Sequence, residues 1–199
     1  MIIVQKFGGT SLSDEYSRQH VLRHIRREKA EGNRLVVVVS AMGRRGEPYA
    51  TDTLLDWIAQ NGNSLPEREK DLLLSCGELI SAATLCSLLN REGIPAVALT
   101  GGQAGIRTDA RFGFARIVDV NSARILEYLE EDKVVVVAGF QGATEDGEVT
   151  TLGRGGSDTS ATALGAALPA GIVDIYTDVD GVYTTDPRIV PKAQRMTKI

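Results

Sequence analysis

The sequence predicts an α/β fold in which a mainly parallel central sheet is covered by helices on both faces. Apolar runs that do not alternate with polar residues, such as residues 35–39 and 133–138, are typical of strands buried on both faces. These runs alternate almost strictly with stretches of helical periodicity, which is the pattern of a parallel sheet built from strand–helix–strand units. The expected arrangement therefore has three layers, with the sheet between two layers of helices.

The expected strands are short apolar segments that end in polar or glycine-rich loops. They lie at residues 2–7, 35–39, 94–99, 133–138 and 172–177. A turn at residues 145–147, Glu-Asp-Gly, also predicts a hairpin within residues 141–152. Because ligands of open parallel sheets bind beyond the carboxyl ends of the strands, we expect the loops that follow the strands to meet at one functional edge.

The expected helices lie at residues 14–31, 51–59, 67–91, 121–130 and 158–167. In the third helix, apolar residues recur at alternating steps of four and three, which predicts one apolar stripe. These residues are Leu72, Cys76, Leu79, Ala83 and Cys86. Its two cysteines are ten residues apart, or about 15 Å along a helix, too far for a disulfide. We expect both to be small buried side chains in a reducing compartment.

Composition limits the class of ligand. The 199 residues are 43% hydrophobic and carry a formal net charge of -4, which opposes general binding to nucleic acid or to an anionic membrane. The longest apolar run, near residues 133–140, is far shorter than the roughly 20 residues of a membrane span. Met1 leads directly into a strand rather than a signal sequence. We therefore expect a cytoplasmic protein with small ligands, forming a single domain because no linker or repeat divides the chain.

Two distant glycine pairs carry the strongest functional signal. Gly8-Gly9 follows Lys6 at the end of the first strand, and Gly155-Gly156 stands between Arg154 and the last helix. A glycine pair between a strand and a helix lets backbone N–H groups turn toward one anion. Two such cradles, with a lysine, an arginine and hydroxyls, predict a kinase-like site for a polyphosphate and a second anion. The alternative is a tight turn that needs positive φ and leaves the lysine solvated.

Standard nucleotide-binding fingerprints are missing, since the sequence has no Gly-Lys pair and no Gly-x-Gly-x-x-Gly at either glycine pair. Five other motifs occur in order along the chain. They are Lys-Phe-Gly-Gly-Thr-Ser at residues 6–11, Val-Ser-Ala-Met-Gly at 39–43, Cys-Gly-Glu at 76–78, Gly-Arg-Gly-Gly-Ser-Asp-Thr at 153–159, and Tyr-Thr-Asp-Val-Asp-Gly-Val-Tyr-Thr-Thr-Asp-Pro-Arg at 176–188. Together they resemble the aspartokinases, within the amino acid kinase superfamily.

The resemblance implies ATP-dependent phosphorylation of the side-chain carboxylate of L-aspartate, with Mg²⁺, as the first step toward lysine, threonine and methionine. We also expect a cytoplasmic homo-oligomer, the location from the composition and the self-association from apolar faces that missing elements would leave exposed. The chemistry agrees, because an aspartate side chain with a pKa near 3.9 is ionised at pH 7 and needs no general base. Electrostatic repulsion between this carboxylate and the triphosphate opposes the transfer, so cationic groups and N–H donors are expected in the site.

On the nucleotide side, the resemblance implies that Lys6 stabilises charge on the transferred phosphoryl group and that Asp158 orients this lysine. Gly8 and Gly9 are expected to cradle phosphates. The full set expected to bind the nucleotide is Lys6, Phe7, Gly8, Gly9, Ser40, Ser157, Thr177, Asp178, Tyr183, Asp186 and Arg188. Residues such as Asp178 and Asp180 have the alternative interpretation of turn formers, or of direct metal ligands; no metal-binding residue is assigned.

On the acceptor side, Arg154 can clamp a carboxylate through two hydrogen bonds, and Glu78 can take the α-ammonium. The alternative for Glu78 is a solvent-facing helical residue. The expected acceptor-binding residues are Thr51, Glu78, Arg154, Gly155, Gly156 and Ser157. The segment before Thr51, residues 44–50, is longer than the common family loop and resembles that of some diaminopimelate-responsive isoforms.

Aspartokinases ordinarily continue beyond the motifs found here, with a second nucleotide-contacting lysine and regulatory ACT modules. The expectation is therefore one catalytic domain over residues 1–199, incomplete at its C-terminal end and without an ACT module. Apolar faces that missing elements would cover should then be exposed and favour self-association. A second functional hypothesis follows, in which the chain is a nucleotide-binding structural or regulatory protein of the same fold that does not catalyse transfer.

Overall fold

A five-stranded parallel sheet forms the centre of the computed structural model, which describes residues 1–60, 62, 64–177, 184–185, 190 and 192–196. Its strands are β1 (Ile2–Phe7), β2 (Arg34–Val39), β3 (Ala96–Leu99), β6 (Val134–Ala138) and β9 (Ala170–Tyr176), in the order β3-β6-β2-β1-β9. Every pairing in this sheet is parallel. The predicted fold class and all five predicted strands are confirmed.

Valine-rich strands occupy the middle of the sheet because both of their faces are covered. Val36 to Val39 of β2 pair with Val135 to Ala138 of β6, and these residues have no solvent exposure. Strands buried on both faces need no polar alternation, which is why these segments read as continuous apolar runs. β9 lies at the edge of the sheet beside β1, and its side chains are largely exposed.

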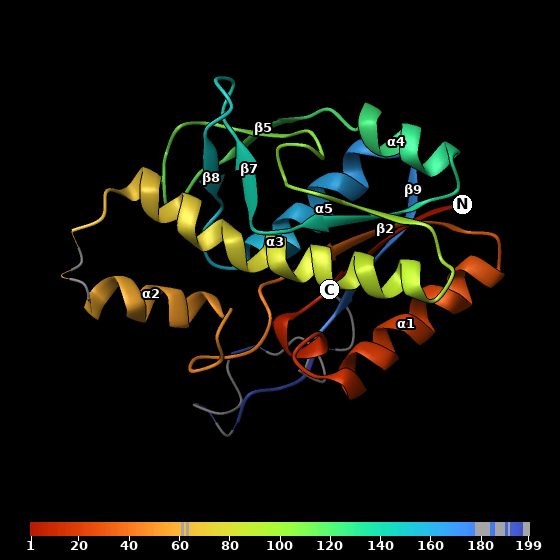
Figure 1. Cartoon of the computed structure of the whole chain (residues 1–199), viewed down its shortest axis with the longest axis horizontal. Helices are drawn as coiled ribbons and strands as arrows, with labels where there is room; N and C mark the ends of the chain where they lie inside the picture. Colours follow the sequence, from red (N-terminus) through yellow and green to blue (C-terminus); the bar gives the residue numbers. More distant parts are fainter. Residues whose placement is uncertain (61, 63, 178–183, 186–189, 191, 197–199) are drawn as a thin grey trace.

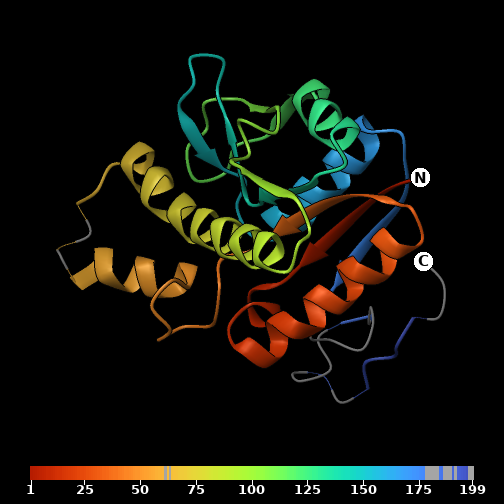
Figure 2. The same ribbon diagram turned by 45° about the vertical axis from the view of Figure 1, so that its right-hand side comes forward.

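Helices cover both faces of this sheet (Figures 1 and 2). On one face, α1 (Glu15–Ala30) and α3 (Glu67–Arg91) pack against the odd-numbered valines of β2, while α4 (Ala123–Glu130) and α5 (Gly156–Ala167) pack on the other. α1 begins where Asp14 accepts a hydrogen bond from the Ser17 N–H at 2.8 Å, a standard N-cap. α2 (Thr51–Gln60) lies against α3 rather than the sheet. The three predicted layers are present.

A second, smaller sheet was not anticipated apart from its hairpin. It contains β4 (Ile106–Thr108), β5 (Ile117–Val120), β7 (Gln141–Ala143) and β8 (Val149–Thr151), in the order β5-β4-β7-β8. The antiparallel β7–β8 pair confirms the hairpin predicted within residues 141–152. β4 and β5 were missed, because strands of three and four residues are too short to show a periodic pattern. In Figure 1 the hairpin projects beyond α3.

The apolar stripe of α3 lies on the opposite face from the one that packs on the sheet. Leu72 is 51% exposed and Leu79 is 43% exposed. Cys76 is also exposed and Cys86 is half-buried, so the expected burial of Cys76 is wrong. Both thiols are free. The inner face mixes apolar and polar residues. It buries Leu74, Ala82, Leu85 and Leu89 together with Asp71, Ser75, Gly77, Glu78 and Ser81. Local periodicity therefore identified the stripe but not the direction in which it points.

α3 is also the one helix within the described part of the chain that is long and apolar enough to cross a membrane. Its best 18-residue window has a mean hydropathy of 1.8, and 44% of that window is buried inside the fold. The sequence estimate, based on uninterrupted apolar runs, overlooked it. Length and composition are the sole grounds for this classification, and a core helix of a folded domain meets the same criteria.

Candidate functional site

A cavity of about 380 Å³ lies at the carboxyl edge of the central sheet. Its walls come from the end of β1, the segment after β2, α2, α3 and the start of α5. Nine of the residues predicted for the site line it together. They are Lys6, Ser40, Thr51, Glu78, Arg154, Gly155, Gly156, Ser157 and Asp158. Residues from both glycine-pair motifs, 150 positions apart in the sequence, therefore share one cavity.

Lys6 and Asp158 form an ion pair inside this cavity, with Nζ 2.7 Å from Oδ1. The lysine side chain is only 11% exposed, whereas that of the aspartate is 47% exposed. Lys6 stands one residue before the end of β1, and Asp158 belongs to the first turn of α5. The pair therefore fixes the ammonium group beside the arginine-bearing turn, so the alternative of a freely solvated lysine is wrong.

Glycine at position 9 allows the loop after β1 to pack directly against the loop after β2. A Cβ at Gly9 would lie 2.3 Å from the Ala41 carbonyl oxygen and 3.1 Å from that of Gly43. Any side chain there would separate the β1–α1 turn from the segment that follows β2. At Gly8 a Cβ would lie 3.8 Å from the Lys6 Nζ, so this backbone passes next to the ammonium group. Neither glycine lines the cavity itself.

The start of α5 provides the second cradle. Gly155, at the N-cap position, has φ of 75°, a left-handed conformation that favours glycine, and no side chain caps the helix. Gly156 packs closely, since a Cβ there would lie 2.8 Å from the Phe140 ring. The first turn of this 12-residue helix thus borders the cavity with its N–H groups and the positive end of its dipole. This arrangement fits an anionic group.

Glu78 is the buried acid of the site, with an exposed fraction of 2%. Its Oε1 accepts a hydrogen bond from the Ala41 N–H at 3.0 Å, while Oε2 has no hydrogen-bond partner. Burial raises the pKa of this carboxyl to about 8, against a usual value of 4.5. The alternative of a solvent-facing glutamate is therefore wrong. An unpartnered carboxyl oxygen bordering a cavity fits a cationic or N–H-bearing ligand, and a bound cation would favour the ionised form of Glu78.

The pKa of Glu78 predicts how stability depends on pH. Between about pH 4.5 and pH 8 the folded chain holds a proton on Glu78 that the unfolded chain has lost. The free energy of unfolding should therefore decrease as pH rises through this range, by up to about 1.4 kcal/mol per pH unit from this group. In Glu78→Gln this contribution should vanish. Urea unfolding of both proteins at several pH values measures it, and parallel pH profiles would contradict it.

Several residues that line the cavity were not predicted as site residues, although two of them, Ala41 and Gly153, lie within the quoted motifs. They are Ala41, Asp52, Leu55, Leu74, Phe140 and Gly153. Phe140 has φ of 65°, which is uncommon outside glycine, and its N–H donates to the Ser160 Oγ at 3.1 Å. This hydrogen bond to Ser160 of α5 holds the strained segment after β6 beside the cavity. A glycine-aromatic pair directly after the β6 valines was the one hint that the sequence offered.

Other predicted nucleotide residues lie elsewhere. Phe7 is 2% exposed and stacks on Tyr176, with ring centroids 4.6 Å apart. Phe7 and Thr177 border a separate hollow of about 280 Å³ that also includes His20 and His24. The Phe7 side chain is therefore part of the core and does not reach the cavity that holds Lys6. Four further residues predicted to bind the nucleotide lie outside the described residues, as does Asp180 with its alternative interpretations. The four are Asp178, Tyr183, Asp186 and Arg188.

The fold and the cavity define a class of protein: a three-layer α/β domain with a pocket at the carboxyl edge of its sheet that is lined by Lys6, Arg154 and the first turn of α5. A family model described as "Amino acid kinase family" matches residues 1–199, and the chain belongs to this family. Within the family it is similar to aspartokinases. Aspartokinase 1 of Bacillus subtilis (strain 168) is 54% identical over 97% of the chain and 48% of that relative.

Solved structures give the same result. The aspartate kinase of Synechocystis is similar with a TM-score of 0.80 and 47% identity, covering 100% of this chain and 32% of the other. Aspartokinase III of E. coli in complex with aspartate and ADP is similar with a TM-score of 0.79 and 30% identity, covering 98% and 53%. The chain spans about half the length of the curated relatives that it matches.

Proposed function

We propose that the chain contributes the catalytic site of an aspartate kinase, which transfers a phosphoryl group from ATP to the side chain of L-aspartate and forms 4-phospho-L-aspartate. The observation that carries this proposal is the single cavity in which the Lys6–Asp158 pair stands with Arg154 and the orphaned Glu78 oxygen. The similarity to aspartokinases, one of them bound to aspartate and ADP, supports the choice of substrates.

The donor side of the proposed site consists of groups that bind phosphate. Lys6 stabilises the negative charge of the transferred group, and the first turn of α5 adds N–H donors from Gly156 and Ser157. Ser40 and the backbone at Gly8 and Gly9 complete the nucleotide contacts. ATP supplies the phosphoryl group when bound, with Mg²⁺ on its phosphates. The residues fit such a metal–nucleotide pair, because the Lys6 ammonium and the first turn of α5 border one cavity and Mg²⁺ on nucleotides takes few protein ligands.

The acceptor side of the proposed site recognises a zwitterion with a second carboxylate. Arg154 is exposed at the rim of the cavity and can take a carboxylate through two parallel hydrogen bonds. The buried Glu78 takes the α-ammonium with its unpartnered Oε2, and Thr51 contacts the substrate from the start of α2. The attacking carboxylate is already ionised at neutral pH, so these residues orient it and none has to remove a proton.

The finer assignments extend the same proposal. Thr177, Asp178, Tyr183, Asp186 and Arg188 contact the nucleoside or its phosphates, following the motif that they share with aspartokinases. Residues 1–199 form one catalytic domain, and the reaction is the first step toward lysine, threonine and methionine. The protein acts in the cytoplasm. Support for this location comes from the content of charged residues, 24% of the chain, and from the biosynthetic reaction proposed.

An acceptor comparison tests the proposed function. With Mg-ATP as donor, phosphoryl transfer should be at least about 100-fold faster to aspartate than to glutamate or UMP, because a site built for one chain length leaves polar groups unpaired with another. Calorimetric titration with Mg-ATP, performed on the same protein, reports nucleotide binding separately. Preference for another acceptor would remove the assignment to aspartate. Nucleotide binding without transfer to any acceptor would favour a non-catalytic nucleotide-binding protein.

A further inference from the structure

Phe140 is fixed by hydrogen bonds to both of its backbone polar groups. Its φ of 65° lies in the left-handed region, which is costly for an aromatic residue. The N–H donates to the Ser160 Oγ of α5 at 3.1 Å, and the carbonyl oxygen accepts from the Leu152 N–H at 2.8 Å. Leu152 stands two residues before Arg154. Residue 140 therefore connects α5 to the segment that leads to Arg154.

The Phe140 ring packs against the first turn of α5. A Cβ at Gly156 would lie 2.8 Å from the Phe140 Cδ2, so a side chain at position 156 would displace the ring. A Cβ at Gly139 would lie 2.9 Å from the Ser157 Cβ, so the backbone before the ring contacts the same turn. Two glycines thus let an aromatic side chain lie beside the N–H groups of Gly156 and Ser157, which we propose as phosphate donors.

The Ser160 hydroxyl joins Phe140 to α5. Ser160 is fully buried, and its Oγ accepts the hydrogen bond from the Phe140 N–H and donates one to the Gly156 carbonyl oxygen at 2.9 Å. A hydroxyl in a helix commonly bonds only to the preceding turn, as that of Thr162 does to the Asp158 carbonyl oxygen at 2.8 Å. Without the Ser160 hydroxyl, the Phe140 N–H would lose its acceptor and the strained φ would lose this support.

We propose that Phe140 determines the length of the acceptor side chain, admitting aspartate and excluding glutamate, and that Ser160 is the residue that positions it. This inference rests on the proposed function. The acceptor carboxylate has to reach the phosphoryl group beside Lys6 and the first turn of α5, so its carbon chain passes next to that turn. The Phe140 ring contacts this turn and lines the cavity, and it occupies the space that one additional methylene group would need.

The size of the ring and its place in the cavity favour Phe140 over the other apolar wall residues. Leu55 and Leu74 also line the cavity, but they come from α2 and α3, whereas Phe140 contacts the turn at which transfer is proposed. An apolar wall discriminates against one additional methylene group by roughly 10- to 200-fold. This range includes the preference for aspartate over glutamate that the proposed function requires.

The ratio of kcat/KM for aspartate to kcat/KM for glutamate, with Mg-ATP as donor, tests the role of the ring. Phe140→Ala should lower this ratio at least about tenfold, partly through a higher kcat/KM for glutamate, because space is opened for its longer side chain. Phe114→Ala is the matched control. Phe114 is 75% exposed and its ring lies beside Gly153, but it does not line the cavity, so the ratio should stay within about twofold of wild type. An unchanged ratio in Phe140→Ala would overturn the proposal.

A double-mutant cycle tests whether Ser160 acts through Phe140. Ser160→Ala should lower the ratio about fivefold in the wild-type background and should have no further effect in the Phe140→Ala background. Thr162→Val removes an exposed hydroxyl of the same helix and should leave the ratio unchanged. Equal effects of Ser160→Ala in both backgrounds would overturn the positioning role. Thermal melting verifies that each variant folds, and Phe140→Leu, which keeps an apolar side chain, replaces Phe140→Ala if that variant does not.

Calorimetric titration with each amino acid separates this inference from the proposed function. Wild type should bind aspartate more tightly than glutamate, and Phe140→Ala should reduce that preference at least about tenfold. If wild type binds aspartate with this preference but transfers no phosphoryl group, the proposed catalysis fails and the inference about Phe140 stands. If wild type binds both amino acids equally well, or binds neither, the inference fails whatever the transfer rate is.

Discussion

Replacing Lys6 by methionine is expected to reduce phosphoryl transfer to aspartate by about 1,000-fold, the effect of removing a principal charge-stabilising group from a phosphoryl-transfer site. The Lys6 ammonium is the one cation in the cavity that is nearly enclosed, with a side-chain exposure of 11%, and Asp158 holds it in place at 2.7 Å. Methionine retains a similar length and apolar stem, so the strand end should keep its packing. Initial rates with saturating Mg-ATP and aspartate measure the loss.

Two further variants separate charge from position. Lys133→Met removes another lysine from an ion pair, with Glu131, at the start of β6 and thus at the opposite end of the sheet. It should leave the transfer rate within about twofold of wild type, because an exposed surface pair contributes little. Asp158→Asn keeps the lysine but loosens its orientation, and should cost less than Lys6→Met. If Lys6→Met retains a tenth of wild-type activity, Lys6 is not the phosphoryl-stabilising residue.

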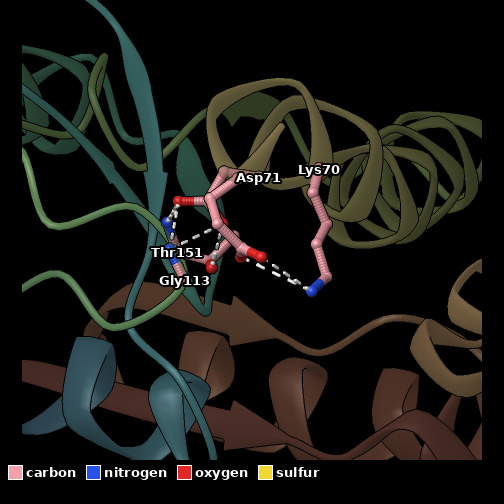
Figure 3. A network of polar contacts seen from close by, with 5 residues as sticks. Lys70, Asp71, Gly113 and Thr151 are labelled. Carbon is pink, nitrogen blue, oxygen red and sulfur yellow. Dashed lines mark hydrogen bonds and ion pairs between the residues drawn. The ribbon is translucent and has the colours of Figure 1, made fainter. Parts of the chain in front are cut away.

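Asp71→Ala is expected to lower the free energy of unfolding by about 3 to 5 kcal/mol, a loss comparable to the total stability of a weakly stable domain. Asp71 is fully buried in α3 (Figure 3). Its two carboxylate oxygens accept hydrogen bonds from the Gly113 N–H, the Thr151 N–H and the Thr151 hydroxyl, at 2.7 to 3.0 Å. Alanine leaves these donors buried without an acceptor.

The consequence of this substitution should be local as well as global. Asp71 connects α3 to β8 and to the segment before β5, and so joins the small sheet to the helix that carries Glu78. Urea unfolding measures the change. Glu67→Gln is a suitable control, because its carboxylate pairs with Lys70 on the helix surface and its loss should change stability by less than about 0.5 kcal/mol. A loss below about 1 kcal/mol in Asp71→Ala would show that water replaces the aspartate.

Much of the site was readable in the sequence because its backbone chemistry is local. A glycine pair after a strand or before a helix has few structural uses, and the glycine at position 155 does adopt positive φ at the start of α5. The meeting of the two motifs followed from a general rule, that loops at the carboxyl ends of parallel strands converge. Lys6 and Asp158 confirm that convergence with a direct ion pair.

The missed features depend on partners that are distant in the sequence. Phe140 reaches the cavity wall through a left-handed conformation supported by Ser160, and no local pattern encodes that support. Strands β4 and β5 consist of three and four residues, and pairing with each other and with β7 defines them more than composition does. For Phe7 the motif implied nucleotide contact, and the tertiary packing places its ring in the core, away from the cavity that contains Lys6.

The sequence by itself determined the layered α/β class, the succession of strands and helices along the chain, and the positions of both glycine pairs, since periodicity and backbone preference act over a few residues. Only the tertiary structure decided which face of α3 is buried. Both faces of α3 carry apolar residues at helical spacing. The inward face packs Leu85 and Leu89 in the core, and it can also bury Asp71 and Glu78 because Thr151, Gly113 and Ala41 supply hydrogen-bonding partners for them. This orientation of α3 leaves the apolar stripe exposed on the outer face of the helix.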